Sequence, residues 1–529
     1  MGLSGDPGAR SGRGRAWSAS CFSGIILALI FPVDDRTALP VISDTSHSQS
    51  SSSSGLAGSW GEDTIVALST ATGVGAIGIV RMSGPAAVDI AESVFRPGRG
   101  SGLRPDETHH LLYGHVVDPH EGGDVDEVLL AVMRAPHSYT REDIVEVHCH
   151  GGLAAQRAVL RLLVRLGARP AEPGEFTRRA FLNGRIDLAQ AESVAAIVSA
   201  RSSGALRASV RQLEGGLSER LQAVRRSLVS LLAQIEATVD FSDEDVEALD
   251  WQGLGDGLLT ARGDLEKLLK TAFVGRALEH GLTTAIVGKP NVGKSSLLNA
   301  LLMRERAIVS DIPGTTRDTV EELMEIGGIP IHLVDTAGIR AGGDHVERLG
   351  VERSVKAMEQ ADLVLAVIDI SKLWDDGDRA FVTGLDRSRS LIVCNKIDLT
   401  GDGGRRAEAL GSFLGNGSGA ESGDWRICAV SAVTGEGLED LRSAIETVVS
   451  GGAGLHLEEP VLASERQRSL VGEAFDRTEA ALVGTSLSTN EELICEDIRE
   501  AIQALGRITG EDLTRDLLDE IFSRFCIGK

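Results

Sequence analysis

The sequence predicts an α/β P-loop nucleotide-binding domain inserted in an all-α helical domain, preceded by a small α+β N-terminal domain. A glycine-rich phosphate loop lies between a strand pattern and a helix pattern within residues 282–450. Apolar residues recur at helical spacing on both sides of that region, in residues 178–281 and 451–529. Short strands and turns fill residues 61–177. We therefore expect one helical domain built from two separated segments.

Residues 1–60 differ from the rest of the chain and precede the first expected domain. They hold several arginines, a brief apolar run over 24–31 and a serine tract over 46–54. The apolar run is too short to span a bilayer. We expect a disordered extension or a start codon assigned too far upstream. A secretory or organellar signal is the alternative.

Composition limits the class of protein. A chain of 529 residues has room for several domains. Its six cysteines show no C-x-x-C spacing, which fits a reducing compartment, and we expect a cytoplasmic protein. The net charge of −24 argues against a protein that coats nucleic acid, but it permits RNA on a local basic face. Six arginines of the first helical segment form either a solvated helix face or an RNA contact: Arg201, Arg207, Arg211, Arg220, Arg225 and Arg226.

The elements of the flanking regions follow from hydrophobic periodicity. Apolar runs predict strands over 64–68, 78–82, 127–133 and 144–148, and helical spacing predicts helices over 85–95 and 154–166. In the first helical segment, Leu217, Leu221 and Leu228 share one face of a long helix. The same spacing resumes after residue 451 and continues to about residue 522.

The phosphate loop is Gly288–Ser295, which matches G-x-x-x-x-G-K-[ST]. A strand pattern precedes it and a helix pattern follows it, as this loop requires. Its backbone N–H groups would surround phosphate oxygens, Lys294 would reach the β- and γ-phosphates, and the Ser295 hydroxyl would bind Mg²⁺. We expect nucleotide contacts from Asn291, Val292, Gly293, Lys294, Ser295 and Ser296. An ordinary glycine–proline turn is the alternative for an isolated match.

Two motifs downstream concern the metal and the γ-phosphate. Thr316, in Gly314-Thr315-Thr316, is expected to complete the Mg²⁺ shell. The run Asp335-Thr336-Ala337-Gly338 follows an apolar strand, so it places a carboxylate near the metal and the Gly338 amide near the γ-phosphate.

A third motif, Asn395-Lys396-Ile397-Asp398, identifies the base as guanine. The Asp398 carboxylate accepts two N–H bonds from the guanine edge, and adenine cannot donate them. Ser431 and Ala432 add a last base contact. Together with the phosphate loop, these motifs in this order predict a GTP-binding domain.

The hydrolytic groups are less evident. Ile339 follows Gly338, where Ras-like proteins carry a glutamine that orients the attacking water. The sequence offers no obvious internal arginine finger. Asn291 suggests a monovalent cation beside the phosphates, and carbonyls of a nearby loop could cover it: Ser310, Asp311, Ile312, Pro313, Gly314 and Thr315. For the water, Asp344 and Glu347 are the nearby carboxylates, with a solvated loop charge as the alternative for each.

Motifs outside the nucleotide site closely resemble the MnmE (TrmE) family, the tRNA uridine-5-carboxymethylaminomethyl modification GTPases. The resembling stretches are Asp63–Ala67, Pro173–Gly184 and the C-terminal Phe525-Cys526-Ile527-Gly528-Lys529. The resemblance implies an α/β P-loop GTPase domain inserted in an all-α helical domain, preceded by a small α+β N-terminal folate-binding domain. It also implies a homodimer held by the N-terminal domains, and no membrane.

The resemblance implies a K⁺-dependent GTPase that works with the flavoprotein MnmG, in a heterotetramer. The pair would form the carboxymethylaminomethyl group at C5 of the wobble uridine, U34, in certain tRNAs. The one-carbon cofactor would be 5,10-methylene- or 5-formyl-tetrahydrofolate. Carried over by motif, Glu347 would position the water, with Lys294 and Asp344 as further catalytic candidates. The resemblance further implies that K⁺ would be bound by Asn291, Ser310, Ile312 and Thr315, and folate by Arg81, Glu146, Arg185 and Lys529.

Some residues depart from the family pattern, and some alternatives stay open. Arg185 stands where many relatives carry lysine, and Ser310 replaces a common threonine but keeps the hydroxyl. We interpret Cys526 as a structural or positioning residue rather than a nucleophile. The rival function is a ribosome-assembly GTPase switch without folate chemistry, and a weaker one is a GTPase anchored to a membrane through residues 24–31. The sequence leaves open which tRNAs are modified and whether glycine or ammonia is the amino donor.

Overall fold

The structure is a computed structural model. It describes residues 63–71, 73–99, 102–104, 108–240, 250–304, 321–335, 358–401, 410, 425–449, 459–487, 490–511 and 513–529. The extension over residues 1–60, with its apolar run, therefore lies outside the described residues. The chain divides into two units after Gly58, and every described residue belongs to the second unit.

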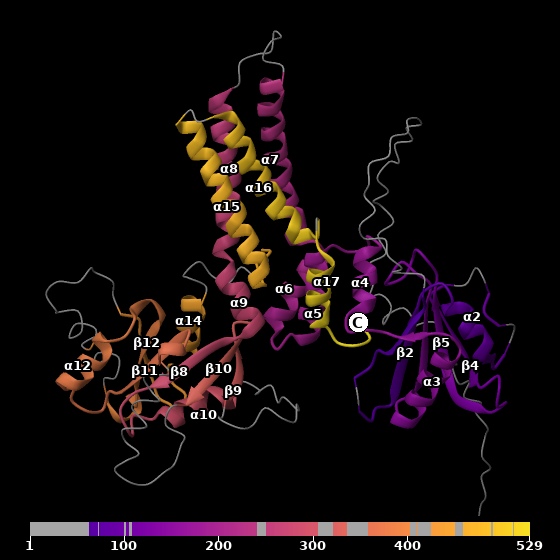
Figure 1. The fold of residues 1–529 in the computed structure, drawn as a ribbon. Coiled ribbons are helices and arrows are strands. Elements are labelled where there is room, and N and C mark those ends of the chain that lie inside the picture. Colours follow the sequence, from indigo (N-terminus) through magenta and orange to yellow (C-terminus); the bar gives the residue numbers. More distant parts are fainter. Residues whose placement is uncertain are drawn as a thin grey trace, which may run out of the picture. The chain divides into compact units, whose positions relative to one another are not determined.

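The N-terminal domain is a mostly antiparallel sheet (Figure 1). Its strands are β1 (Ile65–Leu68), β2 (Ile77–Ser83), β3 (Phe95–Pro97), β4 (His110–Val117), β5 (Asp124–Met133), β6 (Ile144–His150) and β7 (Arg169–Pro170). They lie in the order β3-β4-β5-β6-β2-β1-β7, and β7 pairs parallel with β1. The strands expected from the sequence are present, whereas β3, β4 and β7 were not predicted.

Two helices cover one face of this sheet, α2 (Ala87–Val94) and α3 (Leu153–Arg165). Val80, Val147 and Leu130 lie next to one another in register on β2, β6 and β5, and all are buried in that core. Because successive side chains of a strand point to opposite faces, Arg81, Glu146 and His148 lie on the other face of the sheet.

The helical domain is built from segments on both sides of residues 282–450. The first segment holds α4 (Glu175–Leu182), α5 (Leu188–Ser199), α6 (Ser203–Leu213), α7 (Gly216–Asp240), α8 (Trp251–Lys270) and α9 (Ala272–His280). The second holds α15 (Glu465–Ser486), α16 (Glu491–Thr509) and α17 (Arg515–Ser523). The boundary expected between residues 177 and 178 falls inside α4.

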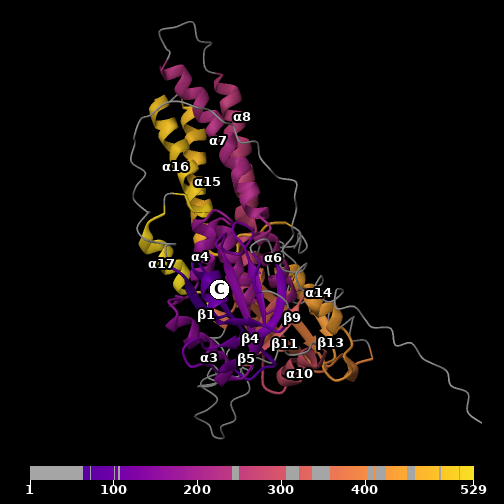
Figure 2. The ribbon, with the colours of Figure 1, turned by 90° about the vertical axis from the view of Figure 1, so that its right-hand side faces the viewer.

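Four of these helices, α7, α8, α15 and α16, lie side by side and share one hydrophobic core (Figures 1 and 2). Leu228, Leu258, Ala474 and Ile498 each contribute from a different helix. Local signals fix where helices begin. The Ser464 side chain accepts from the N–H of Gln467, whose own side chain reaches back to the Ser464 N–H, and this capping box starts α15.

The α/β domain is a six-stranded sheet in the order β13-β12-β11-β8-β10-β9. Its elements are β8 (Leu282–Val287), α10 (Lys294–Arg304), β9 (Glu321–Ile326), β10 (Ile329–Asp335), β11 (Leu363–Asp369), α12 (Asp376–Thr383), β12 (Ser390–Asn395), β13 (Ile427–Val430) and α14 (Leu438–Val449). Every residue of β11 and β12 is buried, which is typical of parallel strands covered on both faces. In such sheets, ligands bind beyond the carboxyl ends of the strands.

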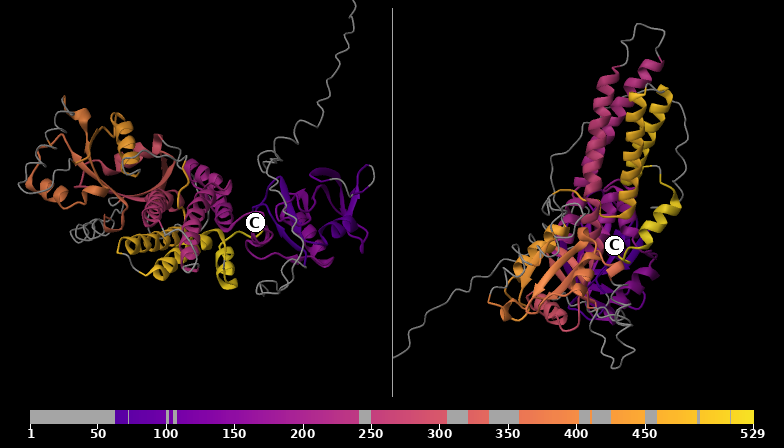
Figure 3. Two further views of the ribbon diagram at one scale, coloured as in Figure 1. Left: turned by 90° about the horizontal axis from the view of Figure 1, so that it is seen from above. Right: turned by 90° about the vertical axis from the view of Figure 1, so that its left-hand side faces the viewer.

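The C-terminal tail returns to the N-terminal domain, and the C-terminus is marked beside it in Figure 3. The Ser69 hydroxyl donates to the Gly528 carbonyl at 3.2 Å, and the Gly174 N–H donates to the Cys526 carbonyl at 3.3 Å. Gly528 has φ 94°, and a Cβ there would lie 2.4 Å from the Leu68 carbonyl oxygen. The tail can therefore follow this path only with a glycine at that position.

Candidate functional site

The phosphate loop joins β8 to α10, as the sequence predicts. Its two motif glycines are required because neighbouring atoms lie too close to allow a Cβ at either position. A Cβ at Gly288 would lie 2.3 Å from the Val367 carbonyl oxygen, and one at Gly293 would lie 2.3 Å from Asn395 Nδ2. The Lys294 ammonium donates to the carbonyls of Gly288 and Lys289 at 2.9 and 3.0 Å. A positive charge is therefore held within a loop that can surround phosphate oxygens.

The base motif is connected to the phosphate loop by direct hydrogen bonds. Asn395 Nδ2 donates to the Val292 carbonyl at 2.9 Å, while its Oδ1 accepts from the Ala432 N–H at 3.1 Å. Lys396 Nζ donates to the Asn291 carbonyl at 2.8 Å. One amide and one ammonium thus tie the carboxyl ends of β8, β12 and β13 together.

Asp398 is oriented by its neighbour in the last motif. The Ser431 hydroxyl donates to Asp398 Oδ1 at 2.7 Å. Lys396 also donates to Asp369 Oδ2, at 2.7 Å, at the end of β11. Burial alone would raise the pKa of Asp369, but the hydrogen bonds from Lys396 and Ser371 together outweigh it and lower that pKa. These contacts place Asn395, Lys396, Asp398, Ser431 and Ala432 at one edge of the sheet.

A contact that the sequence reasoning missed involves Lys289. Its ammonium lies 2.7 Å from Asp375 Oδ1 and 2.8 Å from Asp378 Oδ1, at the start of α12. The hydrogen bond to Asp375 raises the pKa of Lys289. The pair links the phosphate loop to α12, and no local pattern in the sequence predicts it.

Most of the groups expected to act on the γ-phosphate lie outside the described residues. These are Ser310, Asp311, Ile312, Pro313, Gly314, Thr315, Thr316, Thr336, Ala337, Gly338, Asp344 and Glu347. Asp335 is the last residue of β10. The K⁺ and water-positioning assignments therefore stay predictions.

The second set of predicted site residues meets on the face of the N-terminal sheet opposite α2 and α3. Arg81 and Glu146 are register partners on β2 and β6, and Arg81 Nε donates to Glu146 Oε1 at 2.7 Å. His148 Nε2 lies 3.2 Å from Glu146 Oε2. Burial by itself raises the pKa of Glu146, but His148 and Arg81 outweigh it and lower the pKa to about 2. Glu146 therefore stays ionised at neutral pH.

Aromatic rings complete this cluster. The Arg185 guanidinium lies over the Tyr139 ring, 4.8 Å from its centroid, and Arg81 lies 5.8 Å from the same centroid. Arg81 is also 5.7 Å from the centroid of Phe176. Sequence reasoning missed both rings. It also missed His148, although its position two residues after Glu146 on one strand places both on the same face.

The C-terminal tail supplies the last member. Arg81 Nη1 donates to the Gly528 carbonyl at 3.5 Å. Burial lowers the pKa of the Lys529 ammonium, and the neighbouring charge of Arg81 lowers it further. The structure thus brings together Arg81, Glu146, Arg185 and Lys529, which are far apart in the sequence. The cluster is rich in positive charge and aromatic surface.

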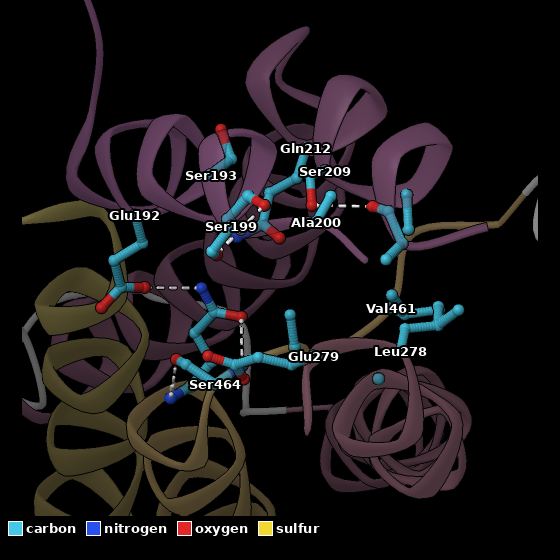
Figure 4. Close-up of a pocket in the computed structure, with 16 residues that line it drawn as sticks. Glu192, Ser193, Ser199, Ala200, Ser209, Gln212, Leu278, Glu279, Val461 and Ser464 are labelled. Atoms are coloured by element: carbon cyan, nitrogen blue, oxygen red, sulfur yellow. Dashed lines mark hydrogen bonds between the residues drawn. The ribbon is translucent and has the colours of Figure 1, made fainter. Parts of the chain in front are cut away.

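A separate cavity of about 50 Å³ lies between α5, α6, α9 and the start of α15 (Figure 4). Glu192 and Glu279 line it, and Gln467 donates to Glu192 at 2.6 Å. Burial raises the pKa of Glu279. Of the described residues around this cavity, none belongs to the nucleotide set or to the cluster around Tyr139. It has room for only a few water molecules.

No helix in the described part of the chain is both long and apolar enough to cross a membrane.

The phosphate loop after β8, with guanine-recognition residues after β12 and β13, defines a P-loop GTPase. Family comparisons extend this class to the flanking domains. Residues 64–185 match the family described as "GTP-binding protein TrmE N-terminus", and residues 188–526 match "MnmE helical domain". The chain belongs to the MnmE family of tRNA modification GTPases, and it is a GTP hydrolase that acts in tRNA modification.

Individual relatives match over nearly their whole length. The tRNA modification GTPase MnmE of Moorella thermoacetica is 46% identical over 470 residues, which cover 88% of this chain and 100% of the relative. That of Symbiobacterium thermophilum is 44% identical over 471 residues, covering 89% and 100%. That of Desulforamulus reducens is 42% identical over 470 residues, covering 88% and 100%.

Proposed function

We propose that this protein is a K⁺-dependent GTPase that works with an MnmG flavoprotein. Together they form the carboxymethylaminomethyl group at C5 of wobble uridine U34 in certain tRNAs. The observation that carries the proposal is one cluster of side chains: Arg81 and Arg185 lie over Tyr139, Glu146 pairs with Arg81, and the Lys529 ammonium neighbours Arg81. A ribosome-assembly GTPase that only binds RNA has no need for such a cluster.

The cluster suits a tetrahydrofolate derivative, 5,10-methylene- or 5-formyl-tetrahydrofolate. Such a cofactor has a flat, polar ring system and a tail of glutamate carboxylates. Arginine and lysine groups bind carboxylates, and the partly exposed ring of Tyr139 offers a face for a flat ring. The Glu146 carboxylate is ionised and accepts N–H bonds from a donor edge. When bound, the cofactor supplies a one-carbon unit.

In the GTP site, Asn395, Lys396 and Asp398 recognise guanine, and the residues from Asn291 to Ser296 hold the phosphates. Ser295 and Thr316 bind Mg²⁺, whereas K⁺ is bound by Asn291, Ser310, Ile312 and Thr315. Glu347 positions the attacking water, with Lys294 and Asp344 assisting. The nucleotide-binding domain is an insertion over residues 282–450.

The assembly is part of the same proposal. The protein forms a homodimer through its N-terminal domains, whose open sheet face exposes Leu111, Tyr113 and Leu129. It binds MnmG in a heterotetramer, and it acts on tRNA in the cytoplasm.

The test is nucleoside mass spectrometry of tRNA from cells that lack this gene. The cells are complemented with the wild type, with Glu347→Ala, or with Arg81→Gln as a variant that keeps the GTP site. We expect the C5-substituted wobble uridine to be lost in the deletion strain and restored by the wild type alone. Both variants should retain GTP binding, measured on the purified proteins.

An unchanged nucleoside profile in the deletion strain would contradict the proposal and favour a ribosome-assembly switch. If Arg81→Gln restores the modified nucleoside, the GTPase part of the proposal would stand without the folate part. The GTPase would still be needed for modification, but the cluster around Tyr139 would be structural.

A further inference from the structure

The outer face of α3 carries a row of arginines that the proposed function does not use (α3 in Figure 1). Arg157, Arg161 and Arg165 follow one another at four-residue spacing, and the helix contains no aspartate or glutamate. Each step of four residues rises about 6 Å along a helix axis, so the three side chains form one row. The opposite face is buried against the sheet through residues such as Val159 and Leu162.

Two of these arginines are available for a partner. Arg165 bonds Asp118 in a short ion pair and lies 3.5 Å from Glu121. Arg157 and Arg161 are exposed, and neither forms an ion pair or hydrogen bond within the part of the chain that the structure describes. The row therefore presents uncompensated positive charge in a protein whose net charge is −24.

The arginines that the sequence singled out in the helical domain behave differently. Arg225 lies 2.6 Å from Glu511, and Arg220 lies 3.6 Å from Glu459. Arg207 donates to the Ser203 carbonyl. These contacts favour the interpretation as a solvated, ion-paired helix face. Arg201, in the connection between α5 and α6, and Arg226, on α7, are exposed and do not form a row.

We propose that the α3 face, defined as Arg157 and Arg161, binds the phosphate backbone of tRNA. Guanidinium groups bind phosphates in a fork, and a repeating cationic row suits a repeating anion. A protein partner is less favoured, because the arginines that anchor protein interfaces are accompanied by Trp or Tyr in packed pockets and α3 has no aromatic residue. The proposal rests on the proposed function only in taking tRNA as the substrate.

The test compares full-length wild type with Arg157→Gln/Arg161→Gln. The probe is an unmodified transcript of a tRNA with a wobble uridine, and its affinity is measured by fluorescence anisotropy across a KCl series. Each phosphate contact contributes about 0.7–0.9 to the slope of log affinity against log salt. We therefore expect the slope to fall by about 1.5 and the affinity at low salt to fall about tenfold.

The matched control is Arg201→Gln/Arg226→Gln, which removes the same charge from two exposed arginines outside the row. We expect it to bind tRNA like the wild type. GTP turnover and melting temperature should be unchanged in both double variants, because the replaced side chains are exposed and no nucleotide residue lies on α3.

Several results would overturn the proposal. One is an unchanged salt slope and affinity in the α3 variant, and another is an equal loss in the control. A variant that binds tRNA normally but fails to restore the modified nucleoside in cells would assign the α3 face to an acidic protein instead. If the wild type itself does not bind tRNA, the proposed function fails together with this inference.

Discussion

The choice of nucleotide depends on one carboxylate in this chain. Asp398 is held by the Ser431 hydroxyl at 2.7 Å, and its neighbour Lys396 is tied to the phosphate loop through the Asn291 carbonyl. A base that cannot donate hydrogen bonds to the Asp398 carboxylate therefore leaves it unpaired, because these contacts hold the side chain in place. Specificity and phosphate binding are coupled through the same short set of hydrogen bonds.

We expect Asp398→Asn to weaken GTP binding at least tenfold, because each hydrogen bond to a charged group contributes about 1.5–3 kcal/mol. The asparagine N–H group would face the donors of guanine, whereas xanthine offers a carbonyl there. Affinity for a xanthosine nucleotide should therefore rise. Titration with fluorescent nucleotides measures both effects. The control is Ser431→Ala, which should show a smaller loss, and an unchanged affinity of Asp398→Asn for GTP would mean that another group recognises guanine.

The Glu146 carboxylate gives the N-terminal domain a pH dependence of known sign. Its pKa is lowered from 4.5 to about 2 in the folded protein. The stabilisation is therefore fully present above pH 4.5 and is lost as the pH falls toward 2. A shift of this size corresponds to about 3 kcal/mol.

We expect Glu146→Gln to reduce the protection of β2 and β6 amides in hydrogen exchange at pH 7. The difference from the wild type should shrink as the pH falls through 4 toward 3, after correction for intrinsic exchange. Glu127→Gln is a suitable control because Glu127 lies on the neighbouring strand β5, away from Arg81. A difference that stays constant with pH would show that the ionised form is not what stabilises the pair.

Among the elements, the C-terminal tail has the most specific requirement. Gly528 combines φ 94° with a Cβ position 2.4 Å from the Leu68 carbonyl oxygen. We expect Gly528→Ala to displace the tail and lower the affinity for 5-formyl-tetrahydrofolate about tenfold, since such backbone strain costs about 1–3 kcal/mol. GTP affinity should not change. Isothermal titration calorimetry measures both ligands.

Gly472→Ala is the matched control, because its added Cβ meets nothing within 4 Å and α15 is an ordinary helix there. It should bind 5-formyl-tetrahydrofolate as the wild type does. If Gly528→Ala also binds 5-formyl-tetrahydrofolate normally, the docked conformation of the tail is not needed for Lys529 to contribute to folate binding.

Hydrophobic periodicity predicted the strands and helices well, but it did not predict which side chains from different elements contact one another. The strands over 78–82 and 144–148 are present, but Arg81 and Glu146 were assigned by family resemblance, and only the register of β2 and β6 shows that they lie on one face. The rings of Tyr139 and Phe176 were not predicted, because they come from a loop and a helix that no local pattern relates to β2. Lys529 was assigned by family resemblance alone, since nothing in its surroundings indicates where a chain end will dock.

At the scale of the whole molecule, the helical domain is one core made from two distant segments. The chain leaves and re-enters this core at neighbouring points, because the Leu462 N–H donates to Thr271 Oγ1 at 3.1 Å. Beyond those points, Ala277, Leu278 and Val461 pack into the core of the α/β domain instead. The helical domain therefore meets the α/β domain at α9, at the segment before α15 and at α6, where Ala205 packs into the same core.

This geometry predicts that the helical domain folds without the α/β domain. Replacing residues 272–461 by a short Gly/Ser linker joins two points that are already adjacent, so loop closure costs little. It also removes Ala277, Leu278 and Val461, which pack on the α/β domain, and leaves only small side chains of α6 such as Ala205 newly exposed. We expect a soluble protein with a cooperative helical transition in circular dichroism and an intact affinity for 5-formyl-tetrahydrofolate. Deleting residues 451–529 should instead leave α7 and α8 without their partners and give an aggregated product. If the linker variant aggregates as well, the helical core depends on the α/β domain for its stability, and the two cannot be independent folding units.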